Sequence, residues 1–241
     1  VTFVKDWDRV IKALADEGVF TRGMCLLTGS DTLILKEAAM RFPGRRGNAK
    51  QTDFHLYPLS FSAYVGLVEK TVPELDMLHL FERYLVSGGY LRAINDVAQY
   101  GEIKEATYQT YEQWVRGDFQ KQGKREEYLA SLIVALLQVG VSQVSYSSLT
   151  QKIGSISKDT CIDYCHILSR MDVLFSLQAY DQNNQKGFPK KARKFHFVDP
   201  FIRESLYRWV RREGLLGAFE DVPGLVESSV ASHCYRHAKT F

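Results

Sequence analysis

The sequence feature that most constrains the fold is a short apolar run at residues 24–28 that ends in a polar Gly-Ser-Asp turn. Apolar residues recur with helical spacing at residues 7–14, and a second helical pattern follows at residues 32–42. Asp6 and Gly18 are expected to begin and end the first helix. An apolar run between two helices predicts a strand buried on both faces of an α/β sheet. One strand cannot form a sheet alone, so its parallel neighbours are expected in polypeptide missing from this chain, unless the segment is a tolerated remnant.

The central part of the chain has a helical pattern throughout. Several short helices are expected over residues 57–118, with a sharp break at the Gly-Gly pair 88–89. A strongly apolar helix is expected over residues 126–139, followed by helices over residues 145–153 and 157–171. Helices of this length joined by tight turns predict a helix-turn-helix core.

Two strands are expected directly after these helices. Residues 174–180 and 194–198 are rich in apolar and aromatic residues, and a long polar and basic loop separates them, so they predict an antiparallel hairpin. Three helices followed by a hairpin are typical of a winged helix. Helical periodicity returns over residues 201–212 and 226–236. The predicted fold class is therefore mainly α with small β parts.

Composition places the chain among ordinary globular proteins. Of its 241 residues, 45% are hydrophobic and 24% charged, and the formal net charge of +3 permits a nucleic-acid partner without requiring one. The strongly apolar part of the chain, within residues 128–143, is shorter than the roughly 18–20 apolar residues that cross a bilayer and includes Ser131 and Gln138, so no membrane partner is expected. The 4 cysteines contain no CxxC pair, which predicts reduced thiols in a cytoplasmic protein.

Several short motifs occur in order along the chain. They are Thr-Gly-Ser at residues 28–30, Pro-Gly-Arg-Arg at 43–46, Tyr-Pro-Leu-Ser-Phe at 57–61, Tyr-Leu-Val-Ser-Gly-Gly-Tyr at 84–90 and Phe-Val-Asp-Pro-Phe at 197–201. In this order the motifs resemble a large family of prokaryotic AAA-type P-loop ATPases, abundant in archaea and bacteria. The resemblance covers nearly the whole chain, whereas any one motif alone would be weak.

The resemblance implies a division of the chain into distinct parts. Residues 1–56 look like the carboxy-terminal remnant of the P-loop ATPase core, 57–120 like a helical lid, 121–200 like a winged helix, and 201–241 like the start of a domain with an endonuclease-like α/β fold. In that last domain a helix carrying Glu227 matches the family, whereas the acidic strands that bind a metal would lie beyond the chain. No metal site is therefore expected, and nuclease activity is an analogy of fold alone.

ATP and Mg²⁺ are the cofactors that the resemblance implies for an intact parent protein, which the family pattern allows to be a homo-oligomer. The sequence contains no Gly-x-x-x-x-Gly-Lys-Ser/Thr motif. Between Gly117 and Gly123 there is one residue too many, and Arg125 stands where a hydroxyl is needed. The phosphate-binding loop and the acidic Walker B pair are expected before the chain, so this chain alone is expected to bind no nucleotide and to be inactive as an ATP hydrolase.

A small group of residues forms the candidate ATPase site. In related ATPases a hydroxyl at the end of such a strand contacts the γ-phosphate or orients water, so the resemblance assigns Ser30 a catalytic and Thr28 a cofactor-binding role. Ser30 would equally serve as a helix N-cap. The resemblance assigns Arg45 to transition-state charge and Arg46 to the nucleotide, although loop arginines are often simply solvated.

A basic cluster in the expected hairpin loop is the candidate nucleic-acid site. The part of the loop from Lys186 to Lys194 contains no acidic residue, so it can lie along a phosphate backbone, and Lys158 begins the helix that would face the groove. Asp159 and Asp163 on that helix oppose such a contact, and a winged helix serves equally to dock a protein. The candidate nucleic-acid-binding residues are Lys158, Lys186, Lys190, Lys191, Arg193 and Lys194.

Two clusters of cysteine and histidine have spacing that a metal could use. Because each helix offers few further ligands, neither cluster is expected to bind zinc. The clusters are Cys161, Cys165 and His166 on one helix, and His233, Cys234 and His237 on another.

These patterns together predict a fragment of an AAA-type ATPase whose lid and winged helix couple nucleotide state to double-stranded DNA or to a protein partner. The alternative is a winged-helix DNA-binding regulator without ATPase activity. That alternative gives no purpose to the apolar run at 24–28 or to the arginine loop after it. A metal-dependent nuclease would need acidic strand motifs that this chain does not reach.

Overall fold

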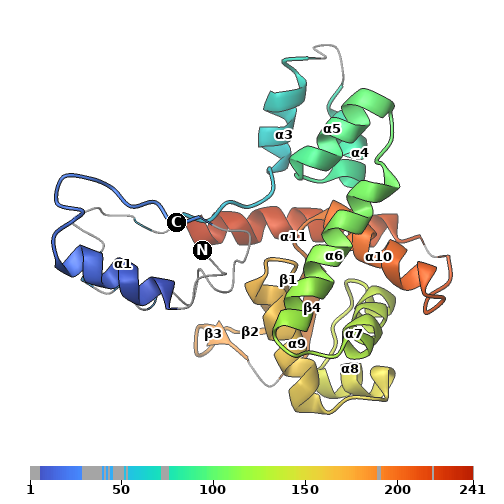
Figure 1. Ribbon diagram of the computed structural model, residues 1–241. Helices are drawn as coiled ribbons and strands as arrows, with labels where there is room; N and C mark the ends of the chain where they lie inside the picture. The colour runs from blue at the N-terminus through green and yellow to red at the C-terminus, as the bar shows by residue number, and fades with distance from the viewer. Residues whose placement is uncertain are drawn as a thin grey trace. The chain divides into compact units, whose positions relative to one another are not determined.

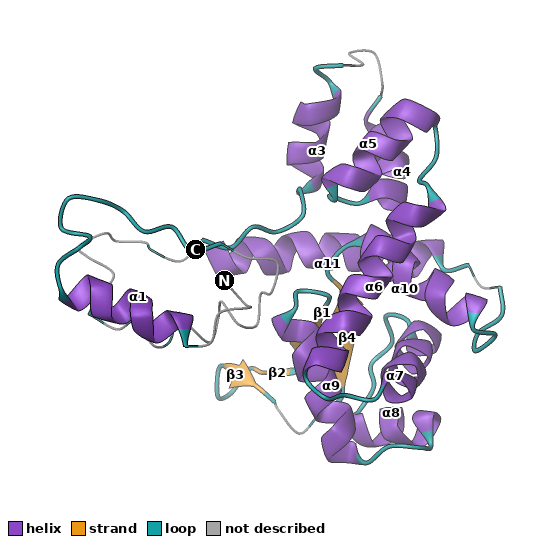
Figure 2. Ribbon diagram, in the orientation of Figure 1, coloured by secondary structure: helices purple, strands orange, loops and turns teal. Residues whose placement is uncertain are grey.

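A computed structural model describes residues 6–28, 40, 42, 44–45, 52, 54–71, 76–188, 191–218 and 220–240. The chain divides into two compact units, residues 1–56 and 57–241. Helices dominate, and the strands are short and antiparallel, which confirms the predicted fold class of mainly α with small β parts (Figure 2).

The first unit contains helix α1, Trp7–Asp16. Trp7 packs with Phe42 and Leu27 in a small apolar cluster. The helix ends before Gly18, whose φ of +77° is the left-handed conformation that glycine adopts readily. Asp6 occupies the N-cap position as expected, but its side chain accepts no capping hydrogen bond.

The expected strand at residues 24–28 is also wrong. The structure assigns these residues to no strand, and the side chains of Met24 and Leu26 are 90% and 76% exposed. A strand is held by hydrogen bonds to a neighbour, and the described part of residues 1–56 contains no second strand to supply them. The helix expected at 32–42 lies almost entirely outside the described residues.

The second unit begins with a group of helices, as predicted. Its capping residues include Ser60 and Asp76, whose side chains accept hydrogen bonds from the first turns of their helices. A sharp break follows at Gly88, which has a φ of +54°. The helices are α3 (Phe61–Val68), α4 (Met77–Ser87), α5 (Leu91–Tyr100) and α6 (Glu105–Lys121).

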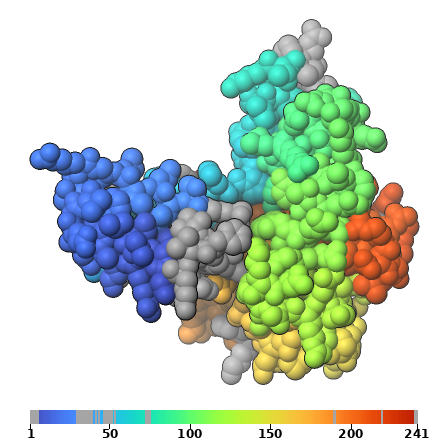
Figure 3. Space-filling model, in the orientation of Figure 1, coloured from blue at the N-terminus to red at the C-terminus, as the bar shows by residue number. Residues whose placement is uncertain are grey.

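Three further helices follow at the predicted places: α7 (Glu126–Val139), α8 (Tyr146–Ile153) and α9 (Lys158–Arg170). Ser145 and Ser157 cap the last two, because each hydroxyl accepts a hydrogen bond from the backbone N–H three residues later. Helix α7 is buried over most of its length and packs on α8, which packs on α9. Helix α7 also packs on α6, and in the space-filling view the green to yellow part of the chain forms one continuous surface (Figure 3).

The strands form the expected hairpin. Strand β1 (Leu174–Gln178) pairs antiparallel with β4 (Arg193–Phe197), so that Phe175 lies opposite His196. Val144, just before α8, pairs with Arg193 at the other edge of β4. The long connection contains a second ladder, in which β2 (Tyr180–Asp181) pairs with β3 (Lys186–Gly187).

Two helices complete the second unit. Helix α10 (Pro200–Arg212) packs against α6, α4 and α7, and buries Phe201 and Trp209. Helix α11 (Val222–Thr240) contacts β4, α10 and α4 (Figure 1). The sheet and the group of helices that begins with α3 are therefore both packed against the same carboxy-terminal helix.

Candidate functional site

Three of the sequence motifs, at residues 57–61, 84–90 and 197–201, meet inside the second unit. The backbone N–H of Leu59 donates to the carbonyl of Gly89 at 2.8 Å, and the hydroxyl of Tyr84 donates to the carbonyl of Leu59 at 3.0 Å. The N–H of Gly89 donates to the carboxylate of Asp199 at 2.8 Å. We call this site the motif junction; it consists of residues 58–61, 84, 88–89 and 198–199 together with His233 and Arg236 of α11.

Asp199 is the buried anion of the motif junction. Its second oxygen accepts a hydrogen bond from the N–H of Phe201 at 2.9 Å, so the same carboxylate caps α10 and binds Gly89. The pKa of Asp199 is raised to about 6 by burial, which the hydrogen bond from Gly89 and the positive charge of Arg236 only partly oppose. The carboxylate is thus held in place by donors that come from separate parts of the chain.

Arg236 is the buried cation of the motif junction. One guanidinium nitrogen donates to the carbonyl of Pro58 and another to the carbonyl of Val198, each at 2.7 Å. The Ser232 hydroxyl also donates to the carbonyl of Val198. Arg236 therefore ties the segment 57–61 to the residues that follow β4.

His233 makes a second connection between α11 and the segment 57–61. Its Nε2 accepts a hydrogen bond from the N–H of Phe61 at 2.7 Å, and its Nδ1 lies 2.7 Å from the carbonyl of Ser229. A carbonyl only accepts and an N–H only donates, so this arrangement requires the neutral ring with its proton on Nδ1. A protonated ring would place a second N–H against that of Phe61.

The two glycines of the motif junction have no room for a side chain. A Cβ on Gly88 would lie 1.8 Å from a carboxylate oxygen of Asp199, and one on Gly89 would lie 2.1 Å from the carbonyl oxygen of Leu59. The backbone of residues 88–89 thus approaches both partners more closely than any other residue type allows. The chemistry available here is binding and positioning of the chain, because every polar group named is engaged by the protein itself.

The predicted ATPase residues fall in the first unit. Arg45 makes a two-pronged contact with Asp16, its Nε and one terminal nitrogen lying 2.7 and 2.9 Å from the two carboxylate oxygens. This contact lowers the pKa of Asp16 and raises that of Arg45. Thr28 is exposed in a loop, and Ser30 and Arg46 lie outside the described residues.

The predicted nucleic-acid residues are used unequally by the fold. Arg193 is 8% exposed and lies over the ring of Tyr146, its guanidinium carbon 4.4 Å from the ring centroid. The ammonium of Lys194 forms an ion pair with Glu227 at 2.7 Å. The side chains of Lys158, Lys186 and Lys191 are exposed, and Lys190 lies outside the described residues.

Comparison with known proteins finds a matching family model for each of two parts of the chain. Residues 78–213 match a family model described as a domain of unknown function (DUF8612), which covers more than half of the 241 residues. The chain belongs to the DUF8612 family. Residues 1–65 match a model described as an AAA domain, which supports an ATPase-related region of AAA type at that end. No curated protein and no solved structure matches the chain.

The DUF8612 region, which extends from α4 to the end of α10, contains a buried ionic network. The side chain of Glu112 on α6 is 2% exposed, and one of its oxygens lies 2.6 Å from a guanidinium nitrogen of Arg212 on α10. Arg116 contacts the same carboxylate at 3.0 Å and reaches Glu126 of α7 at 2.6 Å. This network joins α6, α7 and α10 and belongs to the structural core of the DUF8612 region.

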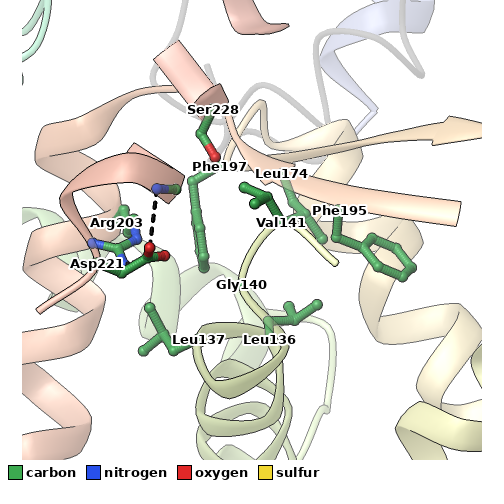
Figure 4. Close-up of a pocket in the computed structure, with 11 residues that line it drawn as sticks. Leu136, Leu137, Gly140, Val141, Leu174, Phe195, Phe197, Arg203, Asp221 and Ser228 are labelled. Carbon is green, nitrogen blue, oxygen red and sulfur yellow. Dashed lines mark hydrogen bonds and ion pairs between the residues drawn. The ribbon is translucent and has the colours of Figure 1, made fainter. Parts of the chain in front are cut away.

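A small cavity is lined by residues of α7, α10, α11 and the sheet, and has a volume of about 10 Å³ (Figure 4). Its lining combines apolar side chains, including Leu137 and Phe197, with the polar side chains of Arg203, Asp221 and Ser228. This volume holds about one water molecule. The cavity is therefore too small for a nucleotide or another organic substrate.

The motif junction contains residues that sequence analysis did not assign to a site. Asp199 precedes a proline at the start of a helix, which is the pattern of an N-cap and could have indicated its hydrogen bond to Phe201. His233 and Arg236 carried no such local signal.

Among the residues that the structure describes, no three potential ligands of His, Cys, Asp or Glu type lie together as a metal site. No described helix combines the length and apolar character needed to cross a bilayer.

Proposed function

We propose that this chain is part of an AAA-type ATPase and that residues 57–241 couple the nucleotide state of the ATPase core to double-stranded DNA or a protein partner. The AAA match over residues 1–65, followed on the same chain by the DUF8612 region, supports this arrangement. ATP and Mg²⁺ serve the intact enzyme. The sequence printed here contains no phosphate-binding loop motif, so hydrolysis requires polypeptide that carries one.

The motif junction is the observation that carries the coupling role. The segment 57–61 directly follows the first unit. Its backbone forms hydrogen bonds with Gly89, Arg236 and His233. A displacement of this segment therefore acts on both α11 and the α4–α5 turn. Coupling of this kind needs an element that responds to both sites, and the segment 57–61 is suited to that role.

In this proposal residues 121–200 are a winged helix. Helices α7, α8 and α9 followed by the β1–β4 hairpin support the assignment, as does the pairing of Val144 with β4. Residues 57–120 then serve as the helical lid and residues 201–241 begin an endonuclease-like domain. Lys158 and the basic hairpin residues, Lys190 among them, provide the contacts to DNA phosphates.

The nucleotide chemistry in this proposal belongs to the first unit. Ser30 orients the attacking water or contacts the γ-phosphate, Thr28 contacts the nucleotide, and Arg46 lies near its phosphates. Arg45 stabilises the transition-state charge. Because Arg45 is paired with Asp16 in the structure, it must exchange that carboxylate for the transferred phosphate.

A winged-helix DNA-binding regulator without ATPase activity is the second candidate. The order of α7, α8, α9 and the hairpin favours it as much as it favours the first. The two candidates differ in the role of residues 1–65, which match an AAA domain and would have no task in a plain regulator.

The test compares two substitutions on α11 in the full-length product of the gene, with ATP hydrolysis measured with and without duplex DNA. His233→Leu removes the acceptor for the Phe61 N–H. We expect hydrolysis without DNA to stay within about twofold of wild type, and stimulation by DNA to be lost. Cys234→Ser alters the exposed neighbouring side chain and is expected to behave as wild type. A full-length protein that does not hydrolyse ATP would exclude the ATPase, and unchanged stimulation in His233→Leu would exclude coupling through the motif junction.

A further inference from the structure

The distal part of the hairpin is a two-stranded ribbon with a firmly built turn. In Figure 1, β2 and β3 extend from β1 and β4 on the side away from α7 and α8. The carboxylate of Asp181 accepts hydrogen bonds from the backbone N–H groups of Asn183 and Asn184, at 3.0 and 3.2 Å, and from the side-chain amide of Asn184 at 2.7 Å. These bonds lower the pKa of Asp181 and hold its charge within the turn.

On both sides of this turn the ribbon carries exposed aromatic rings, and exposed lysines follow the turn. Tyr180 is 63% exposed and Phe188 is 36% exposed. The ammonium of Lys191 lies 4.6 Å from the centroid of the Phe188 ring, and the backbone N–H of Lys191 donates to the carbonyl of Phe188 at 3.1 Å. The exposed side chain of Lys186 lies on β3. We call the set Tyr180, Lys186, Phe188 and Lys191 the hairpin tip.

The cations of the hairpin tip differ from the other basic residues of the hairpin. Arg193 is buried over Tyr146 and Lys194 is paired with Glu227, so both are used within the fold. Among the described residues, Lys186 and Lys191 form no ion pair within 4.0 Å. No acidic residue occurs in residues 182–198. The nearest carboxylate, Asp181, lies opposite Lys186 in the register of β2 and β3, and the charge of Lys191 helps to lower its pKa. Asp181 also accepts hydrogen bonds from Asn183 and Asn184, so it offsets only part of the positive charge of the two lysines.

Helix α9, which a winged helix would place in the major groove, carries acidic as well as basic side chains, unlike the hairpin tip. Its exposed face carries Lys158 beside Asp159 at its start, and Asp163 is paired with Lys124 at 2.7 Å. A helix that enters a groove brings such carboxylates close to phosphates, which repel them. Helix α9 therefore offers no net positive charge at the end that would enter the groove.

We infer that duplex DNA binds this protein through the hairpin tip, by contact with the phosphate backbone and without base reading by α9. Lys186 and Lys191 neutralise phosphates, and the rings of Tyr180 and Phe188 pack on the sugars between them. A two-stranded ribbon fits a groove of B-form DNA. The inference rests on the proposed function, because it supplies the partner to which nucleotide state is coupled.

The experiment measures binding of a fluorescent duplex by the 241-residue chain at several salt concentrations. The double substitution Lys186→Gln and Lys191→Gln is expected to weaken binding by about tenfold or more at low salt. It should also reduce the slope of log affinity against log salt by about 2. The matched control is Lys70→Gln with Lys152→Gln, which removes the same charge from exposed lysines outside the hairpin and is expected to change affinity less than about threefold.

Three results would overturn the inference. The hairpin-tip variant could bind duplex as tightly as the control, Lys158→Gln could weaken binding more than the double substitution, or a single strand of equal length could bind more tightly than the duplex. Circular dichroism of each variant checks that the fold is intact. Because this assay involves no ATP, its outcome is independent of the hydrolysis assay on His233→Leu.

Discussion

The guanidinium of Arg236 lies 4.0 Å from the carboxylate of Asp199, and their side chains are 9% and 0% exposed. This buried pair joins the start of α10 to α11, and the same arginine also binds the carbonyl of Pro58. Charges removed from water are stable only when they have partners of this kind. Each side chain therefore depends on the other: Arg236 holds the segment 57–61 directly, and Asp199 holds Gly89, which accepts a hydrogen bond from Leu59.

Asp199 is expected to make stability depend on pH. Burial raises the pKa of its carboxyl from 3.8 to about 6, so the folded state binds this proton more tightly than the unfolded state. The stabilisation that comes from the protonated Asp199 carboxyl is therefore fully present below about pH 4 and is lost as the pH rises through about 6. The loss amounts to about 3 kcal/mol in the free energy of unfolding. Urea unfolding between pH 5 and pH 7.5 should show wild type gaining stability relative to Asp199→Asn as the pH falls. Parallel pH profiles for the two proteins would refute this expectation.

Removal of the buried cation is expected to be strongly destabilising. Arg236→Met leaves Asp199 without its positive neighbour, takes the guanidinium donor from the Pro58 carbonyl and leaves the Val198 carbonyl with Ser232 as its donor, so the free energy of unfolding should fall by about 3–5 kcal/mol. Arg211→Met, on the exposed side of α10, should change it by less than about 0.5 kcal/mol. Chemical denaturation monitored by tryptophan fluorescence compares the two variants, and similar losses would contradict the role given to Arg236.

Gly89 is expected to tolerate no side chain. In Gly89→Ala the new Cβ would lie 2.1 Å from the carbonyl oxygen of Leu59, so the segment 57–61 must move away. We expect a loss of about 2 kcal/mol or more in the free energy of unfolding. Gly117→Ala is the matched control, because no atom within 4 Å meets its Cβ and alanine favours the interior of α6. That control should be neutral or stabilising by up to about 1 kcal/mol, as measured by thermal unfolding.

The ionic network in the DUF8612 region provides a further test. Arg212→Met leaves the buried carboxylate of Glu112 with Arg116 as its remaining cation, so we expect a loss of about 3 kcal/mol. Glu105→Gln removes the exposed end of the same network and is expected to change stability by less than about 1 kcal/mol. Equal effects in urea unfolding would show that burial of Glu112 does not govern the network.

Local patterns predicted the second unit well because its helices carry their own boundaries. The bounds of α7 agree with the predicted 126–139, and the hydroxyls of Ser145 and Ser157 cap the next two helices as expected. The strand at 24–28 was wrong because its apolar composition alone does not supply a neighbouring strand. The predicted division into lid, winged helix and endonuclease-like start stays a prediction, as do the roles of Ser30, Arg46 and Lys190.

The motif junction could be predicted only in part. Its glycines and Asp199 lie in motifs that the sequence analysis noted, but their meeting depends on contacts between distant parts of the chain. His233 and Arg236 contact residues that are 172 and 178 positions away, and helical periodicity carries no information on such partners. The spacing of His233 with Cys234 and His237 is one that a metal could use, whereas both ring nitrogens of His233 are used in hydrogen bonds.

The boundary between the two compact units falls after Leu56, whose side chain is 95% exposed, and the carbonyl of Pro58 is already fixed by Arg236. Only two peptide bonds separate the last residue of the first unit from the carbonyl that Arg236 binds. A displacement of Leu56 would therefore be transmitted directly to Pro58 and to the guanidinium of Arg236, because no flexible linker lies between them. Inserting residues after Leu56 would therefore weaken this transmission of movement while leaving every contact of Arg236 in place.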